Sequence, residues 1–357
     1  MPHVNFNLNL TKSLSFQGDP IQVVKQDPST LLLGVGFSNG IISLVNQNDI
    51  FSKSIHSLPI LSLDWLVNGK ICLSVDSPEI IIYDPLKDNI SFIKKESNLK
   101  GIRSISPYEI LGWYRNGSTE IIDIRENRKG VVFNKKNYGT GGSKKVGGSS
   151  NRGNGKGGSS NRGNSNPKVN IPKSSTIPSL ITSANINKIN NNLIYTTSVP
   201  GTSLNIWDKR YTSRGEFVCT SKQILNSHTL DFEFINGSIV VMDNIGKIYK
   251  VSETGEYIGE CISKGRVGNG GSGVGNSEER VDTNISNTSS SCISFNPLFN
   301  SLFISNPNGL YSFTNRFTKL LNGPFLGCTG VKEKLFVYTK NEIKEYRIKP
   351  YLSPGEY

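Results

Sequence analysis

The stretch Ile60–Lys95 reads "ILSLDWLVNGKICLSVDSPEIIIYDPLKDNISFIKK". Short runs of β-branched and aromatic residues alternate in it with the breakers "VNG", "DSP" and "PLKD". Such runs bounded by Gly, Pro, Asn and Asp are typical of β-strands joined by tight turns. The pattern therefore predicts one meander of four strands, which are listed as Ile60–Trp65, Lys70–Val75, Glu79–Asp84 and Asn89–Lys94.

The same layout recurs along the chain, and no segment shows a sustained apolar period of 3.6 residues, so we expect an all-β protein. Before the quoted stretch the runs are Ile21–Lys25, Leu31–Gly36, Ile41–Asn46 and a weaker one at Ser52–Ile55. After it they are Ile102–Ile105, Glu109–Tyr114, Ser118–Asp123 and Lys129–Phe133. Two further units run through Leu180–Thr220 and Asp231–Cys261, and a sixth from Cys292 to about Lys319. Repeats of about 40 residues with four strands each are the period of a β-propeller blade.

The C-terminal part of the chain holds only three more runs, Leu326–Val331, Lys334–Tyr338 and Glu342–Tyr346. The N-terminal segment "VNFNLNL", Val4–Leu10, alternates apolar and polar residues and has no meander of its own. Pairing it with the last unit would complete a seventh blade and remove the exposed edges of an open sheet. We therefore expect residues 1–357 to form a single seven-bladed propeller closed by the N-terminal strand, with six or eight blades as alternatives.

The formal charge of +12 is concentrated in one segment of the 357 residues. Residues 134–176 hold nine cations and no acid, which leaves +3 for the rest of the chain. This basic loop also carries a ten-residue duplication, "GGSSNRGNGK" followed by "GGSSNRGNSN". Its Gly/Ser/Asn-rich composition predicts a disordered insertion. The nine cations are Lys135, Lys136, Lys144, Lys145, Arg152, Lys156, Arg162, Lys168 and Lys173.

A second Gly/Ser-rich segment, 263–289, has balanced charges and is predicted to be another disordered insertion. Both insertions fall between the outer strand of one predicted blade and the inner strand of the next, so we expect them on the same face of the ring. The basic loop suits phosphate or acidic-surface contact, which makes nucleic acid a partner through this loop only. A solvated low-complexity expansion without a partner is the alternative.

Other sequence features favour a non-catalytic protein without cofactor or metal. The chain has neither a phosphate-binding Gly loop nor a nucleophile elbow, and three histidines, His3, His56 and His228, leave little for metal binding. The five scattered cysteines, without a C-x-x-C pair, are expected to be small core residues in a reducing compartment. No run reaches membrane-span length and no secretory signal is recognised, so we expect a nuclear or cytoplasmic protein, nuclear favoured, that is not secreted.

Two stretches, "HSLPILSLDWLVNGKICLSVDSPEIIIYD" and "LIYTTSVPGTSLNIWDKR", resemble WD40 repeats. The resemblance covers nearly all of the chain outside the two insertions, although only one repeat ends in an intact Trp-Asp, at Trp207 and Asp208. In this family a His before the inner strand, an Asp in the turn after the second strand and the Trp of the third strand form a hydrogen-bonded support. The resemblance thus implies that His56 pairs with Asp76 and that His228 pairs with Asp243, both in structural roles.

Two predicted third strands end in Asp-x-Arg, at Asp123 and Arg125 and again at Asp208 and Arg210. The arrangement is similar to the motif of WD40 substrate receptors of cullin-4 RING ubiquitin ligases, in which the arginine faces a propeller-shaped adaptor. The resemblance implies an adaptor-binding role for Asp123, Arg125, Trp207, Asp208 and Arg210. Each arginine could instead pair locally as a solvated strand-end residue. A scaffold subunit of a nuclear or ribosome-assembly complex, with the basic loop on RNA or acidic protein, is the second functional hypothesis.

Overall fold

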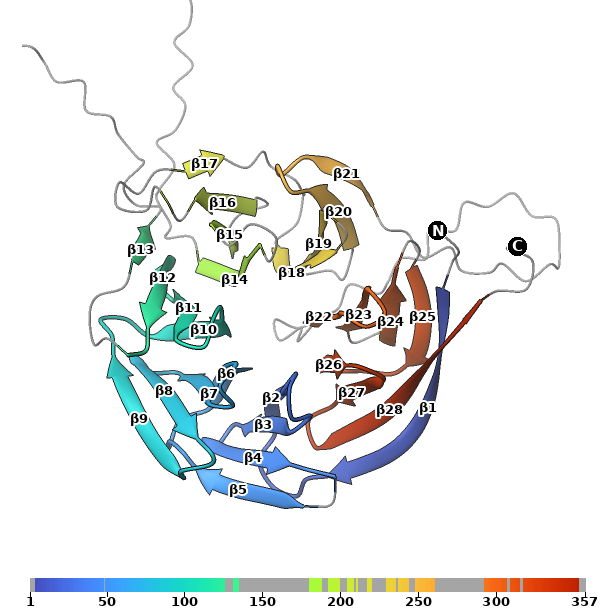
Figure 1. Cartoon of the computed structure of the whole chain (residues 1–357), viewed down its shortest axis with the longest axis horizontal. Helices are drawn as coiled ribbons and strands as arrows, with labels where there is room; N and C mark the ends of the chain where they lie inside the picture. The colour runs from blue at the N-terminus through green and yellow to red at the C-terminus, as the bar shows by residue number, and fades with distance from the viewer. Residues whose placement is uncertain are drawn as a thin grey trace, which may run out of the picture.

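Seven four-stranded antiparallel sheets are arranged as the blades of a ring in the computed structural model (Figure 1). In six of the sheets the four strands follow one another along the chain, from an inner strand near the axis to an outer strand at the rim, and in the seventh sheet the outer strand is the N-terminal one. The structure describes residues 4–47, 49–125, 131–134, 180–187, 192–199, 204–208, 210, 217–219, 229–235, 237–243, 248–260, 292–306, 309–314 and 317–352.

The blades are numbered in chain order. Blade 1 contains β2 (Ile21–Gln26), β3 (Leu33–Phe37), β4 (Ile41–Val45) and β5 (Ile50–Ser54). Blade 2 contains β6 (Ile60–Trp65), β7 (Ile71–Val75), β8 (Glu79–Asp84) and β9 (Asn89–Lys94). Blade 3 contains β10 (Leu99–Ser104), β11 (Glu109–Tyr114), β12 (Ser118–Asp123) and β13 (Val131–Asn134). Blade 4 contains β14 (Leu180–Ile186), β15 (Leu193–Val199), β16 (Leu204–Asp208) and β17 (Phe217–Cys219).

The remaining blades complete the ring. Blade 5 contains β18 (Thr229–Ile235), β19 (Ser238–Asp243), β20 (Ile248–Ser252) and β21 (Tyr257–Glu260). Blade 6 contains β22 (Cys292–Asn296), β23 (Ser301–Asn306), β24 (Gly309–Phe313) and β25 (Phe317–Asn322). Blade 7 contains β26 (Gly327–Val331), β27 (Lys334–Tyr338), β28 (Glu342–Leu352) and, as its outer strand, β1 (Val4–Ser15).

The predicted ring closure is confirmed. Strand β1 pairs antiparallel with β28 from Val4 opposite Leu352 to Ser15 opposite Glu342, with one irregularity between Leu10 and Lys12. Both ends of the described chain therefore lie in one sheet, as Figure 1 shows. The seven-bladed all-β fold is confirmed with it, and the alternatives of six or eight blades are wrong.

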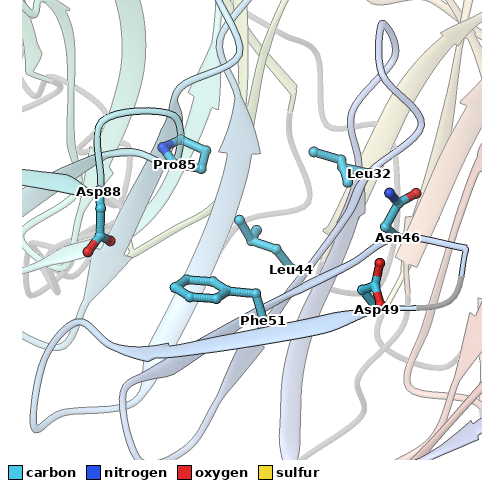
Figure 2. Close-up of a pocket in the computed structure, with 7 residues that line it drawn as sticks. All are labelled: Leu32, Leu44, Asn46, Asp49, Phe51, Pro85 and Asp88. Atoms are coloured by element: carbon cyan, nitrogen blue, oxygen red, sulfur yellow. The ribbon is translucent and has the colours of Figure 1, made fainter.

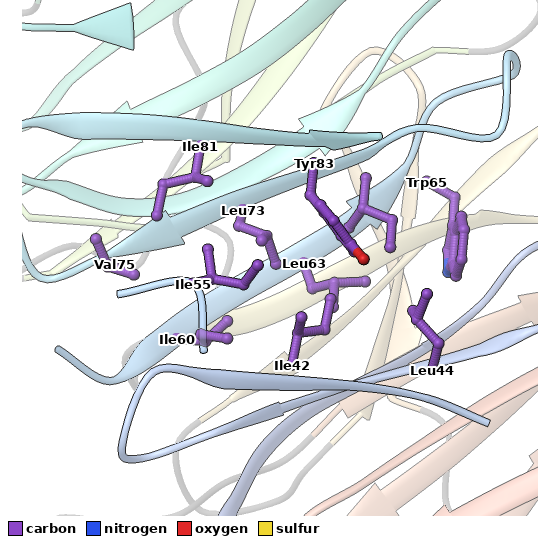
Figure 3. Packing of buried hydrophobic residues seen from close by; sticks show 11 residues of the cluster. Ile42, Leu44, Ile55, Ile60, Leu63, Trp65, Leu73, Val75, Ile81 and Tyr83 are labelled. Atoms are coloured by element: carbon purple, nitrogen blue, oxygen red, sulfur yellow. The ribbon is translucent and has the colours of Figure 1, made fainter. Parts of the chain in front are cut away.

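The core lies between the blades, because each sheet is covered on both faces by its neighbours. The second and third strands are accordingly buried along nearly their whole length, as in β7 and β8. Figure 3 shows the cluster between blades 1 and 2, where Leu44 faces Leu63 and Trp65. The indole Nε1 of Trp65 also donates to the carbonyl oxygen of Lys25 at 3.0 Å, which ties the two inner strands together. This continuous burial explains why the runs were apolar without strict alternation.

Strand β10 begins three residues earlier than its predicted run, Ile102–Ile105. A bulge lies between Leu99 and Gly101. A Cβ added at Gly101 would lie 2.0 Å from the ring of Trp113, so glycine allows the indole to pack directly on the backbone. Gly101 is therefore a packing site inside the strand.

The predicted pairing of His56 with Asp76 is wrong. His56 Nδ1 accepts from the backbone N of Leu58 at 3.0 Å, and its Nε2 lies 3.6 Å from Oε2 of Glu79. Asp76 instead accepts from Nη2 of Arg115 at 2.7 Å, because the next blade supplies a charged donor. In blade 5, Asp243 is buried and accepts from the hydroxyl of Tyr249 at 3.1 Å, while His228 lies outside the described residues.

The two predicted insertions lie outside the described residues, apart from Asn134, which ends β13. Their flanking strands are β13 and β14 in one case and β21 and β22 in the other. Each pair consists of the outer strand of one blade and the inner strand of the next, as expected. The predicted disorder of 134–176 and 263–289 stays a prediction.

Candidate protein-binding face

Because the strands of each blade run antiparallel, successive turns lie on opposite faces of the ring. Turns from the first to the second strand and from the third to the fourth strand share one face, since consecutive strands are antiparallel. Asp123 ends β12 and Asp208 ends β16, the third strands of blades 3 and 4. Both Asp-x-Arg turns therefore lie on this face, which is called the Asp-x-Arg face below. The connections that contain the two insertions leave from the opposite face.

In blade 3 the arginine folds back onto its own aspartate. The backbone N of Arg125 donates to Asp123 Oδ1 at 2.9 Å, Nε donates to the same oxygen at 3.0 Å, and Nη2 donates to Oδ2 at 2.6 Å. The guanidinium carbon also lies 4.4 Å from the ring centroid of Tyr108, in the first turn of the same blade. The Arg125 side chain is nevertheless 60% exposed.

Blade 4 repeats this geometry. The backbone N and Nε of Arg210 each donate to Asp208 Oδ1 at 2.9 Å, and Nη2 donates to Oδ2. Asp208 is buried at 1% exposure, whereas the Arg210 side chain is 60% exposed. Trp207, one residue before, is buried and donates from Nε1 to Thr196 Oγ1 at 3.1 Å in the neighbouring strand. Trp207 thus supports the blade, and Arg210 is the member of the motif that solvent reaches.

Hydrogen bonds from the paired arginines lower the pKa of both Asp123 and Asp208, against a smaller opposing effect of burial. The carboxylates therefore stay ionised well below neutral pH. A carboxyl with a lowered folded-state pKa contributes stability above its ordinary pKa, and that contribution is lost as the pH falls through the lower value. Asp123 and Arg125 are both partly exposed, so their pair contributes at most about 1 kcal/mol, whereas loss of Arg210 would leave the buried Asp208 carboxylate without its cation and cost more.

The Asp-x-Arg face also carries a cavity of about 430 Å³ at the junction of blades 1 and 2. Figure 2 shows its apolar lining, with Leu44 and Phe51 on the side of blade 1 and Pro85 on the side of blade 2. Two carboxylates, Asp49 and Asp88, belong to the same lining. Asp88 accepts from Lys53 Nζ and from the Tyr83 hydroxyl, and the bond from Lys53 lowers its pKa. The cavity can take an apolar side chain beside a carboxylate rim.

Sequence reasoning missed this cavity and two exposed apolar residues on neighbouring turns. Leu86 follows Pro85 in the third turn of blade 2 and is 92% exposed. Tyr108 stands in the first turn of blade 3 and is 46% exposed under the Arg125 guanidinium. The turn sequence "DPLKD" could have indicated an exposed apolar residue, because a leucine inside a polar turn does not pack in the blade core. The Asp-x-Arg face therefore carries exposed apolar residues in blades 1 to 3 and one exposed arginine in each of blades 3 and 4.

The nine cations of the basic loop lie outside the described residues, so their predicted role stays a prediction. Within the part of the chain that is described, no group of three or more His, Cys, Asp or Glu side chains could hold a metal ion. The described residues also form no helix long and apolar enough to cross a membrane.

The architecture is that of WD40 β-propeller domains. Over 96% of the chain it is similar to the β-propeller domain of Cps50 (Swd1) from Myceliophteria thermophila, with a TM-score of 0.64, 11% identity and 100% of that chain covered. It is also similar to the WD40 β-propeller domain of Doa1, with a TM-score of 0.62, 9% identity, and coverage of 96% of this chain and 97% of that one. No protein-family model matches the sequence, and no curated protein matches it.

Proposed function

We propose that this propeller is a non-catalytic interaction scaffold that binds a partner protein on its Asp-x-Arg face. The observation that carries the proposal is the matching geometry of Arg125 and Arg210 in adjacent blades, where the backbone N, Nε and Nη2 of each arginine donate to its aspartate and the side chain stays exposed. Both arginine side chains remain 60% exposed while they are bonded to their aspartates, so a partner protein can reach them. Arginine beside exposed apolar residues is also the composition enriched in protein interfaces.

The partner we propose is the propeller-shaped adaptor of a cullin-4 RING ubiquitin ligase, which would make this protein a substrate receptor of the ligase, acting in the nucleus. Support comes from the resemblance of the paired Asp-x-Arg turns to those of such receptors. Adaptor binding on this face would leave the opposite face, from which the two insertions leave, for a substrate.

Replacing both arginines, Arg125→Ala with Arg210→Ala, should abolish adaptor recovery in affinity purification from the protein's own cells. A hot-spot arginine contributes about 2 kcal/mol or more, so the affinity for the adaptor should fall about thirtyfold at the least. Loss of Arg125 should cost little stability, and loss of Arg210, which leaves the buried Asp208 carboxylate without its cation, should cost more without unfolding the ring. Partners are identified by mass spectrometry, and thermal unfolding verifies the fold.

Arg115→Ala is the matched control. Arg115 is also exposed and bonded to an aspartate, with Nη2 2.7 Å from Asp76 Oδ2, but it lies in the second turn of blade 3 on the opposite face. This variant should recover the adaptor at the level of the unmodified protein. Equal recovery by the double variant would show that the two arginines are ordinary strand-end residues.

The concentration of cations in residues 134–176 favours a second candidate function, a scaffold subunit of a nuclear or ribosome-assembly complex whose basic loop contacts RNA or acidic protein. Replacing Lys135–Lys173 by a neutral Gly/Ser linker of equal length should then weaken RNA binding and flatten its dependence on salt. The double arginine variant should leave that binding unchanged. RNA binding with the same salt slope after the replacement would eliminate this function.

A further inference from the structure

Two cysteines lie together where the inner strands of blades 6 and 7 pack against each other. Cys292 is the first residue of β22, and its Sγ donates to the carbonyl oxygen of Cys328 in β26 at 3.4 Å. Cys328 Sγ donates to the carbonyl oxygen of Phe303 at 3.4 Å. Cys328 is buried, whereas Cys292 is partly exposed. Both are free thiols, and neither belongs to the Asp-x-Arg face.

The environment makes the two thiols unequal. The neighbouring Cys328 thiol lowers the pKa of Cys292 to about 7, and the Lys25 ammonium acts in the same direction, against the effects of burial and of the Asp231 charge. The same interaction with Cys292, together with burial, raises the pKa of Cys328. Cys292 is therefore the more acidic thiol of the pair and belongs to the less buried of the two residues, which makes it the nucleophile, and Cys328 is the second thiol of the exchange.

We propose that Cys292 and Cys328 form a redox-active dithiol, which a small-molecule disulfide such as oxidised glutathione converts into a disulfide between blades 6 and 7. The proposal rests on the contact between the two residues, on the partial exposure of one of them and on the burial of the other. It is independent of the partner proposed for the Asp-x-Arg face.

The reaction proceeds by two exchanges. The Cys292 thiolate, after releasing its proton to water, attacks one sulfur of oxidised glutathione, which forms a mixed disulfide and releases a glutathione thiolate that takes a proton from water. Cys328 then attacks the Cys292 sulfur and passes its proton to the second glutathione as it leaves. Two protein thiols are oxidised to one disulfide, and one molecule of oxidised glutathione is reduced to two thiols.

The rate advantage of Cys292 is modest. At pH 7 a thiol with a pKa of about 7 is about half thiolate. An ordinary cysteine is only about 3% thiolate at this pH. Thiolate nucleophilicity falls with pKa at a Brønsted slope of about 0.45, so the net gain is about threefold. Cys72 is the matched control within the chain, because it is fully buried and burial raises its pKa.

The test is incubation of the full chain with excess oxidised glutathione at pH 7, followed by non-reducing digestion and mass spectrometry. We expect one linked peptide pair joining Cys292 to Cys328, with Cys72 remaining a free thiol. Cys328→Ala should stop the reaction at the mixed disulfide of Cys292 with glutathione. Cys292→Ser should leave Cys328 unmodified, because it is buried.

A measurement on the unmodified protein keeps the test independent of how the variants fold. The modification rate of Cys292 by a slow thiol reagent should follow a pKa near 7 and exceed that of Cys72 at least threefold at pH 7. Free thiols at both Cys292 and Cys328 after full oxidation, or linkage of Cys292 to a cysteine other than Cys328, would overturn the proposal. Absence of a trapped mixed disulfide in a folded Cys328→Ala variant would overturn it as well.

Discussion

Phe6→Ala should lower the free energy of unfolding by about 3–5 kcal/mol, the cost of removing a buried phenylalanine. Phe6 belongs to the closing strand β1 and is 4% exposed. Its ring packs between Phe299 and Phe303 of blade 6, with centroid distances of 5.5 and 5.6 Å. The substitution therefore loosens the closing strand from its neighbouring blade while leaving the backbone pairing of β1 and β28 available. Chemical denaturation measures the change.

Leu10→Ala in the same strand is the control. Leu10 is 55% exposed, so its truncation should change stability by less than about 0.5 kcal/mol. If Phe6→Ala were as harmless as Leu10→Ala, strand β1 would not be a stabilising part of the ring, and closure would have to come from elsewhere.

Arg103→Met should cost a similar amount, about 3–5 kcal/mol, because it leaves a buried carboxylate without its cation. Arg103 of β10 places Nη1 3.2 Å from Oε2 of Glu233 in β18, which joins blade 3 to blade 5. Asn185 of blade 4 donates to the other oxygen of Glu233 at 2.9 Å. Beside this pair, desolvation raises the pKa of Asp231 despite the nearby Arg103 charge.

The loss in Arg103→Met should also depend on pH with a defined sign. A carboxyl whose folded-state pKa is raised destabilises the fold when it ionises, so the stability of the variant should recover as the pH falls toward the raised pKa of Asp231. Arg115→Met, which breaks an exposed pair, should cost no more than about 1 kcal/mol and show no such recovery. A loss in Arg103→Met as small as that of Arg115→Met would mean that the central pair is not coupled to folding.

The fold could be predicted from the sequence because the blade period is strong in the first half of the chain. The predicted runs Ile60–Trp65, Glu79–Asp84 and Asn89–Lys94 coincide with β6, β8 and β9. Prediction of the closing strand succeeded for a similar reason, since Val4–Leu10 alternates and the last unit lacked one strand. Weaker runs shifted by a few residues, as at Ser52–Ile55, which became β5 at Ile50–Ser54.

Side-chain contacts between blades could not be predicted from the sequence, because they depend on how the repeats are arranged around the ring. The partner of Asp76 is Arg115 of the next blade, and the cavity combines Leu44 and Phe51 with Pro85 from another repeat. The ring does supply a rule for finding such contacts. Residues about one repeat apart lie side by side on adjacent inner strands, as in the 3.2 Å bond from Ser62 to the carbonyl oxygen of Ile102, 40 residues away.

The thiol pair obeys this rule. Cys292 and Cys328 are 36 residues apart and occupy the inner strands of consecutive blades. Both had been assigned as small core residues because no C-x-x-C spacing joins them. That assignment fits Cys72 and Cys328, which are buried, but Cys292 is partly exposed. In a repeat protein the relevant cysteine spacing is therefore the length of the repeat.

The central claim, that the Asp-x-Arg face binds the partner, is tested most directly by cross-linking the purified protein to the adaptor with a lysine-reactive reagent. Lys87 is exposed in the third turn of blade 2, on the Asp-x-Arg face, and Lys340 is exposed in the second turn of blade 7, on the opposite face. We expect cross-links from the adaptor to Lys87 and none to Lys340, with the Lys87 links lost in the Arg125→Ala, Arg210→Ala variant. Adaptor cross-links at Lys340 that persist in that variant would contradict the account.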